Sequence, residues 1–156
     1  AARRCRWGIA RIYWLGRRGA DTRPMGRGRR NRVGVVARIQ LRDLCGARSG
    51  DKGDISDISL FADDAVAYEA IRAEVTAARV KAHFGSLVQG PVERFEAPNV
   101  WALKFVAYEA LGGGAPCSLR ADNLGKTFGA NLLRLWIDVP DEVAAGAGRR
   151  RAPVPR

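Results

Sequence analysis

The sequence has few of the residues that build common metal and redox sites. Its 156 residues include three cysteines and one histidine. An odd number of cysteines without a C-x-x-C spacing, together with one histidine, does not supply the ligands of a structural zinc site. No apolar run approaches the roughly 20 residues of a membrane span. The sequence therefore predicts a cytoplasmic protein with reduced thiols and no membrane segment, and it indicates no metal and no cofactor.

Acidic residues are nearly absent from the first quarter of the chain. Residues 1–42 hold 13 arginines and one aspartate, whereas residues 43–140 hold 10 basic and 13 acidic residues. The net charge of +11 therefore arises in the flanks, and the segment expected to fold carries a charge of −3. This distribution argues against a basic nucleic-acid-binding domain, because such a domain concentrates its positive charge on the folded surface.

The two flanks are predicted to be disordered and to lie outside the folded domain. Residues 1–34 could be a nucleic-acid-binding arm, an arginine-rich transit peptide or a solvated extension. We favour the disordered extension, because charge runs that contain glycine bury too little apolar surface to fold. The only methionine is Met25, so part of this segment is hypothesised to lie outside the native product. Residues 141–156, rich in Gly, Pro and Arg, are expected to form a disordered tail.

Residues 35–140 alternate strand and helix signals and are predicted to form one domain. Asp64 and Thr76 are suitable helix N-caps, which predicts either one helix or two with a bend over residues 65–84. A nearly all-apolar helix is expected at residues 100–111, and a hairpin with its turn at residues 122–125. Further strands are expected at residues 33–45, 55–62, 92–96 and 131–139. This order predicts an α+β, ferredoxin-like open sandwich in which a mostly antiparallel sheet carries two helices on one face.

A charged, glycine-containing segment between the first two strands is the strongest candidate for a site. Residues 45–57 read CGARSGDKGDISD, and the candidate ligand-binding residues are Arg48, Ser49, Gly50, Asp51, Lys52, Gly53 and Asp54. Left-handed turns at the glycines could let consecutive N–H groups enclose an anion, with the two basic side chains adding positive charge. The carboxylates could instead hold a hard cation such as Mg²⁺. The third interpretation is structural, with Asp and Ser satisfying the backbone through local turns.

The residues do not indicate a reaction. Ser49 lies beside Asp51 without a G-x-S-x-G elbow, and His83, the only imidazole, is distant in the sequence. A single histidine on an amphipathic helix is more often a surface residue than a catalyst. Cys45 and Cys117 are expected to pack as small apolar groups. Whether the protein is an enzyme stays open at this point.

Five separated blocks of residues carry a resemblance to a known family. The blocks are ARSGDKGD (47–54), RVKAHF (79–84), GPVERFEAPN (90–99), EALGGG (109–114) and SLRADNLGKT (118–127). Together they resemble the C-terminal ferredoxin-like domain of the AtuA family, which is linked to acyclic terpene utilisation, over about residues 36–140. The sequence departs from the family pattern at residues 55–58, where a Thr-Ala-Asn-Ile type run is expected, at residues 115–117, and at Lys104, where Asn is commoner.

The resemblance implies a cytoplasmic bacterial protein of branched, isoprenoid acyl-CoA catabolism, found with carboxylase and hydratase functions. In the family the domain usually follows a much larger domain, so this chain resembles a free-standing version. We therefore expect an accessory subunit that docks to a separate large-domain partner or to a second copy of itself. The alternative is a small enzyme or ligand-binding module that takes an acyl-CoA or carboxylate at residues 48–54. Nucleic-acid binding through residues 1–34 ranks last.

Overall fold

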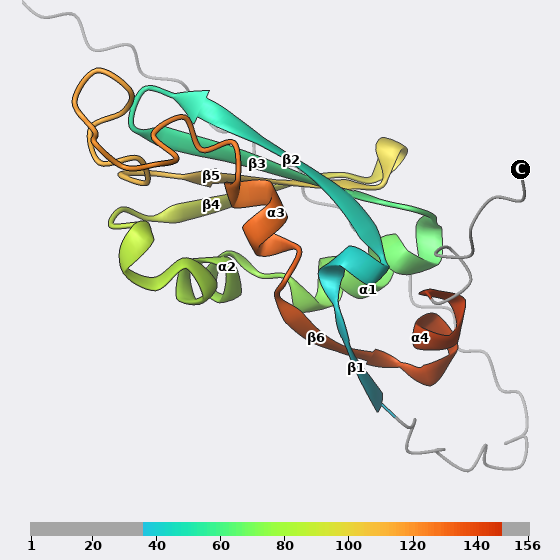
Figure 1. Ribbon diagram of the computed structural model, residues 1–156. Coiled ribbons are helices and arrows are strands. Elements are labelled where there is room, and N and C mark those ends of the chain that lie inside the picture. Colours follow the sequence, from blue (N-terminus) through green and yellow to red (C-terminus); the bar gives the residue numbers. More distant parts are fainter. Residues whose placement is uncertain (1–35, 148–156) are drawn as a thin grey trace, which may run out of the picture. The chain divides into compact units, whose positions relative to one another are not determined.

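The computed structural model describes residues 36–147, so the extension predicted at residues 1–34 and residues 148–156 of the predicted tail lie outside it. Its strands form two sheets (Figure 1). A four-stranded antiparallel sheet has the order β2–β3–β5–β4, and β1 pairs with β6 in a separate antiparallel ladder. The strands are β1 Val36–Gln40, β2 Cys45–Lys52, β3 Ile55–Ala62, β4 Val92–Ala97, β5 Ala102–Ala107 and β6 Trp136–Pro140.

Three helices lie on one face of the four-stranded sheet (Figure 1). They are α1 Ala65–Glu74, α2 Ala77–Phe84 and α3 Phe128–Leu132. Between them and the sheet lies a core in which the inward residues of β3 and β5, Ile58, Leu60, Leu103 and Phe105, are fully buried. A fourth helix, α4 Asp141–Ala147, packs against β1 and β6. The α+β fold with an antiparallel sheet and helices on one face is thus confirmed, with three helices on that face where two were expected.

The connections of the sheet are those of a split β-α-β unit. Strands β3 and β4 both pair antiparallel with β5, so they run parallel to each other on its two sides. Helices α1 and α2 form the crossover between them, and the β4–β5 hairpin returns the chain through the gap. This is the ferredoxin-like arrangement expected from the sequence, although the predicted order of elements placed a helix where β5 stands. Strand β2 occupies the outer edge beside β3.

The run of residues 65–84 forms two helices, and side-chain caps explain the break. The Asp64 carboxylate accepts a hydrogen bond from the Ala67 N–H at 2.8 Å, and the Thr76 hydroxyl accepts one from the Arg79 N–H at 3.2 Å. Val75 between the helices is not helical (φ −95°, ψ 81°), and its side chain is fully buried. The two-helix alternative of the prediction is confirmed.

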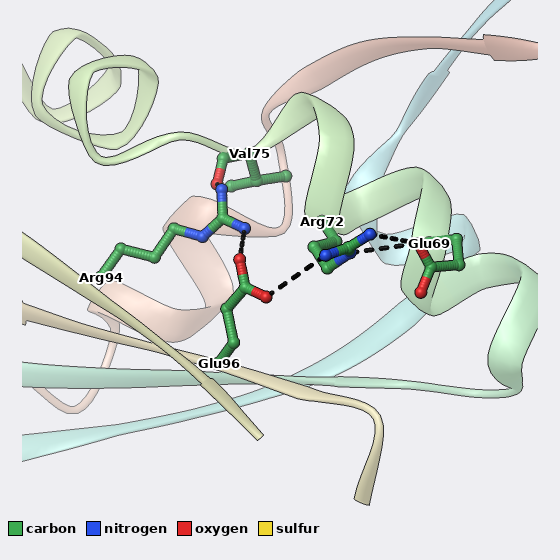
Figure 2. Close-up of polar contacts among 5 residues, drawn as sticks. All are labelled: Glu69, Arg72, Val75, Arg94 and Glu96. Atoms are coloured by element: carbon green, nitrogen blue, oxygen red, sulfur yellow. Dashed lines mark hydrogen bonds and ion pairs between the residues drawn. The ribbon is translucent and has the colours of Figure 1, made fainter. Parts of the chain in front are cut away.

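An arginine on β4 ties this break to the sheet. The Arg94 guanidinium donates to the Val75 carbonyl at 3.2 Å and pairs with Glu96 (Figure 2). Glu96 also faces Arg72 of α1 at 3.6 Å, and Arg72 pairs in turn with Glu69 at 2.8 Å. Because the helix break leaves the Val75 carbonyl without a partner from its own helix, Arg94 replaces the bond that continuous helix would have supplied.

The predicted helix at residues 100–111 is wrong. After a 3-10 turn at Pro98–Val100 and a left-handed residue, Trp101 (φ 49°), the chain forms β5. This strand is central in the sheet, so its inward residues are buried and its outward Val106 is half-buried. Apart from Lys104 the residues of β5 are apolar, and periodicity alone does not distinguish such a short apolar run from a segment of buried helix.

Three predictions at the C-terminal side also need correction. The turn at residues 122–125 exists, with Gly125 at φ 62°, but no strand flanks it. Instead the Asp122 carboxylate accepts bonds from the N–H groups of Lys126 (2.7 Å) and Thr127 (2.9 Å), which leads the chain into α3. The strand predicted at residues 131–139 is the end of α3 followed by β6. Residues 141–147, assigned to a disordered tail, form α4, with Ala147 buried.

Membrane-spanning helices are not found among residues 36–147, since each helix there is too short or too polar.

Candidate functional site

The candidate residues 48–54 form the end of an edge strand and a tight turn. Arg48–Lys52 belong to β2, which pairs with β3 from Cys45↔Ala62 to Lys52↔Ile55, and Gly53 and Asp54 make the turn. Gly53 has φ 67°, the left-handed conformation that a two-residue hairpin turn requires. The segment is therefore the end of β2 and its turn into β3, and not a loop. The single strand predicted at residues 33–45 is also wrong, because that range holds β1, a 3-10 turn and only the first residue of β2. Consecutive N–H groups of a strand point to opposite edges, so the anion-binding concavity predicted from Gly50 and Gly53 does not form in β2.

Alternation along β2 separates the candidate side chains onto two faces of the sheet. Arg48, Gly50 and Lys52 share the face opposite the helices α1–α3, called here the open face. Ser49 points to the helical side, where its hydroxyl accepts a bond from the Gly129 N–H at 2.9 Å and donates to the Gly125 carbonyl at 2.7 Å. Ser49 thus fastens α3 and the preceding turn to the sheet, and its contacts are those of a structural hydroxyl rather than of a nucleophile.

A cleft of about 360 Å³ lies over the open face and the edge of β2. Five of the seven candidate residues line it, together with residues from β3, β5 and the segment before α3. The lining residues are Arg48, Ser49, Gly50, Asp51, Lys52, Asp57, Ser59, Phe61, Lys104 and Lys126. Four basic and two acidic side chains leave the lining with a net charge of +2.

One ion pair in the lining of the cleft joins β5 to β3. Lys104 Nζ of β5 lies 2.9 Å from the Asp57 carboxylate of β3. The hydrogen bond from Lys104 lowers the pKa of Asp57 below its usual value, helped by the charges of Lys104 and Lys52 and opposed by partial burial. Both residues stand at positions where the sequence departs from the expected family pattern, and the structure brings these two departures together as a pair.

The other basic groups of the cleft are less fully neutralised. Lys126 Nζ lies 3.7 Å from Asp51 and Lys52 Nζ donates to the Asp51 carbonyl at 3.1 Å. The Arg48 guanidinium has no hydrogen bond or ion pair with any of residues 36–147. A β-carbon on Gly50 would lie 3.6 Å from Lys126 Nζ, which places this ammonium group above Gly50, between Arg48 and Lys52. The three basic groups therefore form a row along β2, and the Asp57 carboxylate borders this row, since its Oδ1 would lie 3.3 Å from the same β-carbon.

The two carboxylates proposed as a cation site have different partners. Asp54 Oδ1 accepts bonds from the N–H groups of Leu111 (3.0 Å) and Gly113 (2.8 Å), and Asp54 does not line the cleft. A β-carbon on Gly114 would come within 2.6 Å of the Gly53 carbonyl, so the glycine segment packs directly on the β2–β3 turn. Asp54 thus holds residues 111–114 in place, while Asp51 faces Lys126. The structure does not bring Asp51 and Asp54 together as a Mg²⁺ site.

The remaining chemical candidates lie outside the cleft. Among residues 36–147 no group of three or more His, Cys, Asp or Glu side chains could hold a metal ion. His83 on α2 contacts Asn131 instead, with Nε2 3.1 Å from its carbonyl oxygen. Burial raises the pKa of the Cys45 thiol to about 12, with a smaller effect from Asp63, so Cys45 stays protonated and packs as a small apolar group. Cys117 is exposed, contrary to the prediction.

Sequence reasoning missed half of the cleft. Asp57, Ser59 and Phe61 alternate along β3, and the same alternation that identified the strand could have placed them on one face. Lys104 was noticed only as a departure from a family pattern, because residues 100–111 were assigned to a helix. Lys126 had no local signal, since only the packing of the segment before α3 against β2 brings it to the cleft.

Comparison with known proteins gives one result for this chain. A family model described as the AtuA ferredoxin-like domain matches residues 39–138, from the end of β1 to the middle of β6. Comparisons with curated proteins and with solved structures found no match. The matched range contains the whole four-stranded sheet and every residue that lines the cleft.

Proposed function

Because the chain belongs to the AtuA ferredoxin-like domain family, we propose that it serves acyclic terpene or branched acyl-CoA catabolism as an accessory domain that binds an anionic ligand. The ligand occupies the cleft over β2, and Arg48, Lys52 and Lys126 contact its phosphate or carboxylate. The observation that carries this proposal is the guanidinium of Arg48, which has no hydrogen bond or ion pair with any of residues 36–147 and lies in a cleft with a net charge of +2.

The physical argument rests on what each basic group gains from an anion. A guanidinium donates two parallel hydrogen bonds to a carboxylate or phosphate, and a charge-assisted bond is roughly twice as strong as a neutral one. Arg48 has no hydrogen bond or ion pair with any of residues 36–147, so none of these has to break when it binds an anion. Lys104, by contrast, already pairs with Asp57, and this carboxylate largely neutralises its charge. The β2 side of the cleft is therefore where we place the anionic group.

Binding without a reaction fits the lining residues. A nucleophile needs a base within hydrogen-bond reach, yet the two hydroxyls of the cleft, Ser49 and Ser59, have no imidazole among the lining residues. Asp57 is held by Lys104, and its lowered pKa makes it a weak general base at neutral pH. We therefore propose recognition of an anion rather than its chemical conversion.

The test is calorimetric titration with pyrophosphate, a carboxylate and an acyl-CoA at low ionic strength. Arg48→Ala should weaken binding of the preferred anion by about tenfold or more, because one charged hydrogen bond contributes roughly 1.5–3 kcal/mol. Arg42→Ala is the matched control, because Arg42 is also exposed but lies outside the cleft, and it should leave affinity unchanged. Equal loss in both variants, or no binding of any anion by the unmodified protein, would refute the proposal.

A second candidate function is docking to a separate large-domain protein of the same system. It is favoured by exposed apolar side chains on the β4–β5 hairpin, since Phe95, Val100 and Trp101 are each between two fifths and three fifths exposed. Exposed aromatic groups at one place commonly mark an association surface. Co-elution with the large-domain protein should be lost in Trp101→Ser and kept in Leu119→Ser, which changes a fully exposed side chain elsewhere. Co-elution of both variants would exclude this surface.

A further inference from the structure

The open face of the sheet presents an aromatic ring at the end of the basic row. Phe61 of β3 lines the cleft and is 45% exposed although it lies on an inner strand of the sheet. Its cross-strand neighbours are Gly46 of β2 and Ala102 of β5, which carry almost no side chain. A β-carbon on Gly46 would meet nothing within 4 Å. Small neighbours on both strands therefore leave space beside this ring.

Phe61 and Arg48, the nearest residue of the basic row, are diagonal neighbours on strands β3 and β2. Arg48 lies opposite Ser59, two residues before Phe61 on the same strand face. Diagonal neighbours in an antiparallel pair have Cβ atoms about 7–8 Å apart, within reach of long and aromatic side chains. Lys126 and Lys52 continue the row away from Phe61, at roughly 3.3 Å of strand per residue. An aromatic platform thus adjoins one end of a line of three cations.

We propose that the cleft binds a nucleotide, whose base stacks on Phe61 while its phosphates contact Arg48 and Lys126. This inference rests on the proposed anion site and specifies its ligand. A nucleotide joins a planar ring to a chain of negative charges through one sugar, the same sequence of features that runs from Phe61 along β2. A fatty acyl chain fits less well, because Ser59 and Lys104 interrupt the apolar surface between Phe61 and Phe95. ADP and the ADP part of coenzyme A share the required chemistry.

Titration with pyrophosphate, ADP and coenzyme A separates the contributions. The affinity for pyrophosphate measures the contribution of the basic side chains alone. ADP should bind at least about fivefold more tightly, because stacking of its base on an aromatic ring adds to the affinity. Phe61→Leu should remove that gain and leave pyrophosphate binding unchanged. Phe95→Leu is the matched control: Phe95 is an exposed phenylalanine on the same face, on the opposite edge strand and outside the cleft. It should change neither affinity.

A second readout distinguishes stacking from a general loss of surface. The ring current of Phe61 should shift the proton resonances of the adenine upfield in the complex, and Phe61→Leu should abolish the shift while Phe61→Tyr retains it. Tighter binding of coenzyme A than of ADP would identify coenzyme A as the source of the nucleotide, and equal binding would identify a free nucleotide.

The outcomes separate the two proposals. If pyrophosphate binds and ADP binds no better, the anion site stands and the nucleotide inference fails. The inference also fails if Phe61→Leu binds ADP as tightly as the unmodified protein does. If no anion binds, the proposed function itself fails. A single-stranded oligonucleotide that binds far more tightly than ADP would overturn the assignment to a small molecule.

Discussion

At the scale of single residues, position in the alternation of a strand decides which side chains act together. Ser49 and Arg48 are neighbours in the sequence, yet Ser49 fastens α3 from the helical side while Arg48 lies on the open face. Asp54, two residues beyond β2, organises the glycine segment. The cluster of charges that drew attention in the sequence is therefore divided among a cleft, a helix contact and a turn. Lys104 and Lys126 complete the cleft from distant parts of the chain.

The ion pair between Asp57 and Lys104 predicts a pH dependence of stability. Because the pKa of Asp57 is lower in the folded than in the unfolded chain, the pair contributes fully above the ordinary value of 3.8. Its contribution is lost as the pH falls from there through the lowered pKa. Asp57→Asn should reduce the free energy of unfolding by no more than about 1 kcal/mol at pH 7, since the pair is partly exposed.

Denaturant unfolding of Asp57→Asn and the unmodified protein at pH 7 and at pH 3 measures this effect. The two proteins should differ at pH 7 and approach each other at pH 3. A difference that stays constant between these pH values would show that the ion pair does not cause it. Asp138→Asn serves as the control, because Asp138 is exposed on β6 and lies outside the cleft.

At the scale of elements, the helix caps could be predicted from the sequence, whereas the pairing of the strands could not. Asp64 and Thr76 cap helices through bonds to residues three positions later, so their effect is local and the helix break followed from the residues themselves. Strand β5 is formed by neighbours on both sides, one of which lies some forty residues earlier. Its apolar run fits a helix as well as a strand until those neighbours are known.

The arginine that bridges the helix break predicts a matched pair of variants. Arg94→Ala removes the partner of the Val75 carbonyl and should lower the free energy of unfolding by about 1–3 kcal/mol. Arg72→Ala removes exposed ion pairs to Glu69 and Glu96 and should change stability far less than Arg94→Ala does, because water screens such pairs. Thermal and urea denaturation measure both values. A cost for Arg72→Ala equal to that of Arg94→Ala would contradict the special role of the bond at the helix break (Figure 2).

At the scale of the whole molecule, the pairing of β1 with β6 joins the two ends of the described chain. Ile137 on β6 is fully buried and pairs with Ile39, and helices α1 and α4 pack against the ladder. The ladder and the four-stranded sheet thus share one hydrophobic core that includes Leu41, Ile71 and Val139. Because the core is continuous, we expect the two sheets to unfold together.

Shortening one core side chain of the ladder tests this cooperativity. Ile137→Ala should reduce the free energy of unfolding by about 2–5 kcal/mol, as expected for a cavity in a packed core. Far-ultraviolet circular dichroism and tryptophan fluorescence should still give coincident transitions. The control is Val36→Ala, which shortens an exposed residue of the same ladder and should change stability by about 0.5 kcal/mol or less. Separate transitions would show that the ladder unfolds independently of the main sheet.

The sequence by itself determined the properties that depend on local order: the capped helices, the turn at residues 122–125 and the blocks that identify the family. These follow from interactions between residues a few positions apart, so the residues carry them wherever they occur. Only the tertiary structure decided that residues 102–107 form a central strand and that Lys104 and Lys126 join Arg48 in one cleft. Pairing and packing between distant segments set those positions, because a side chain's neighbours across a sheet are not encoded in the residues beside it.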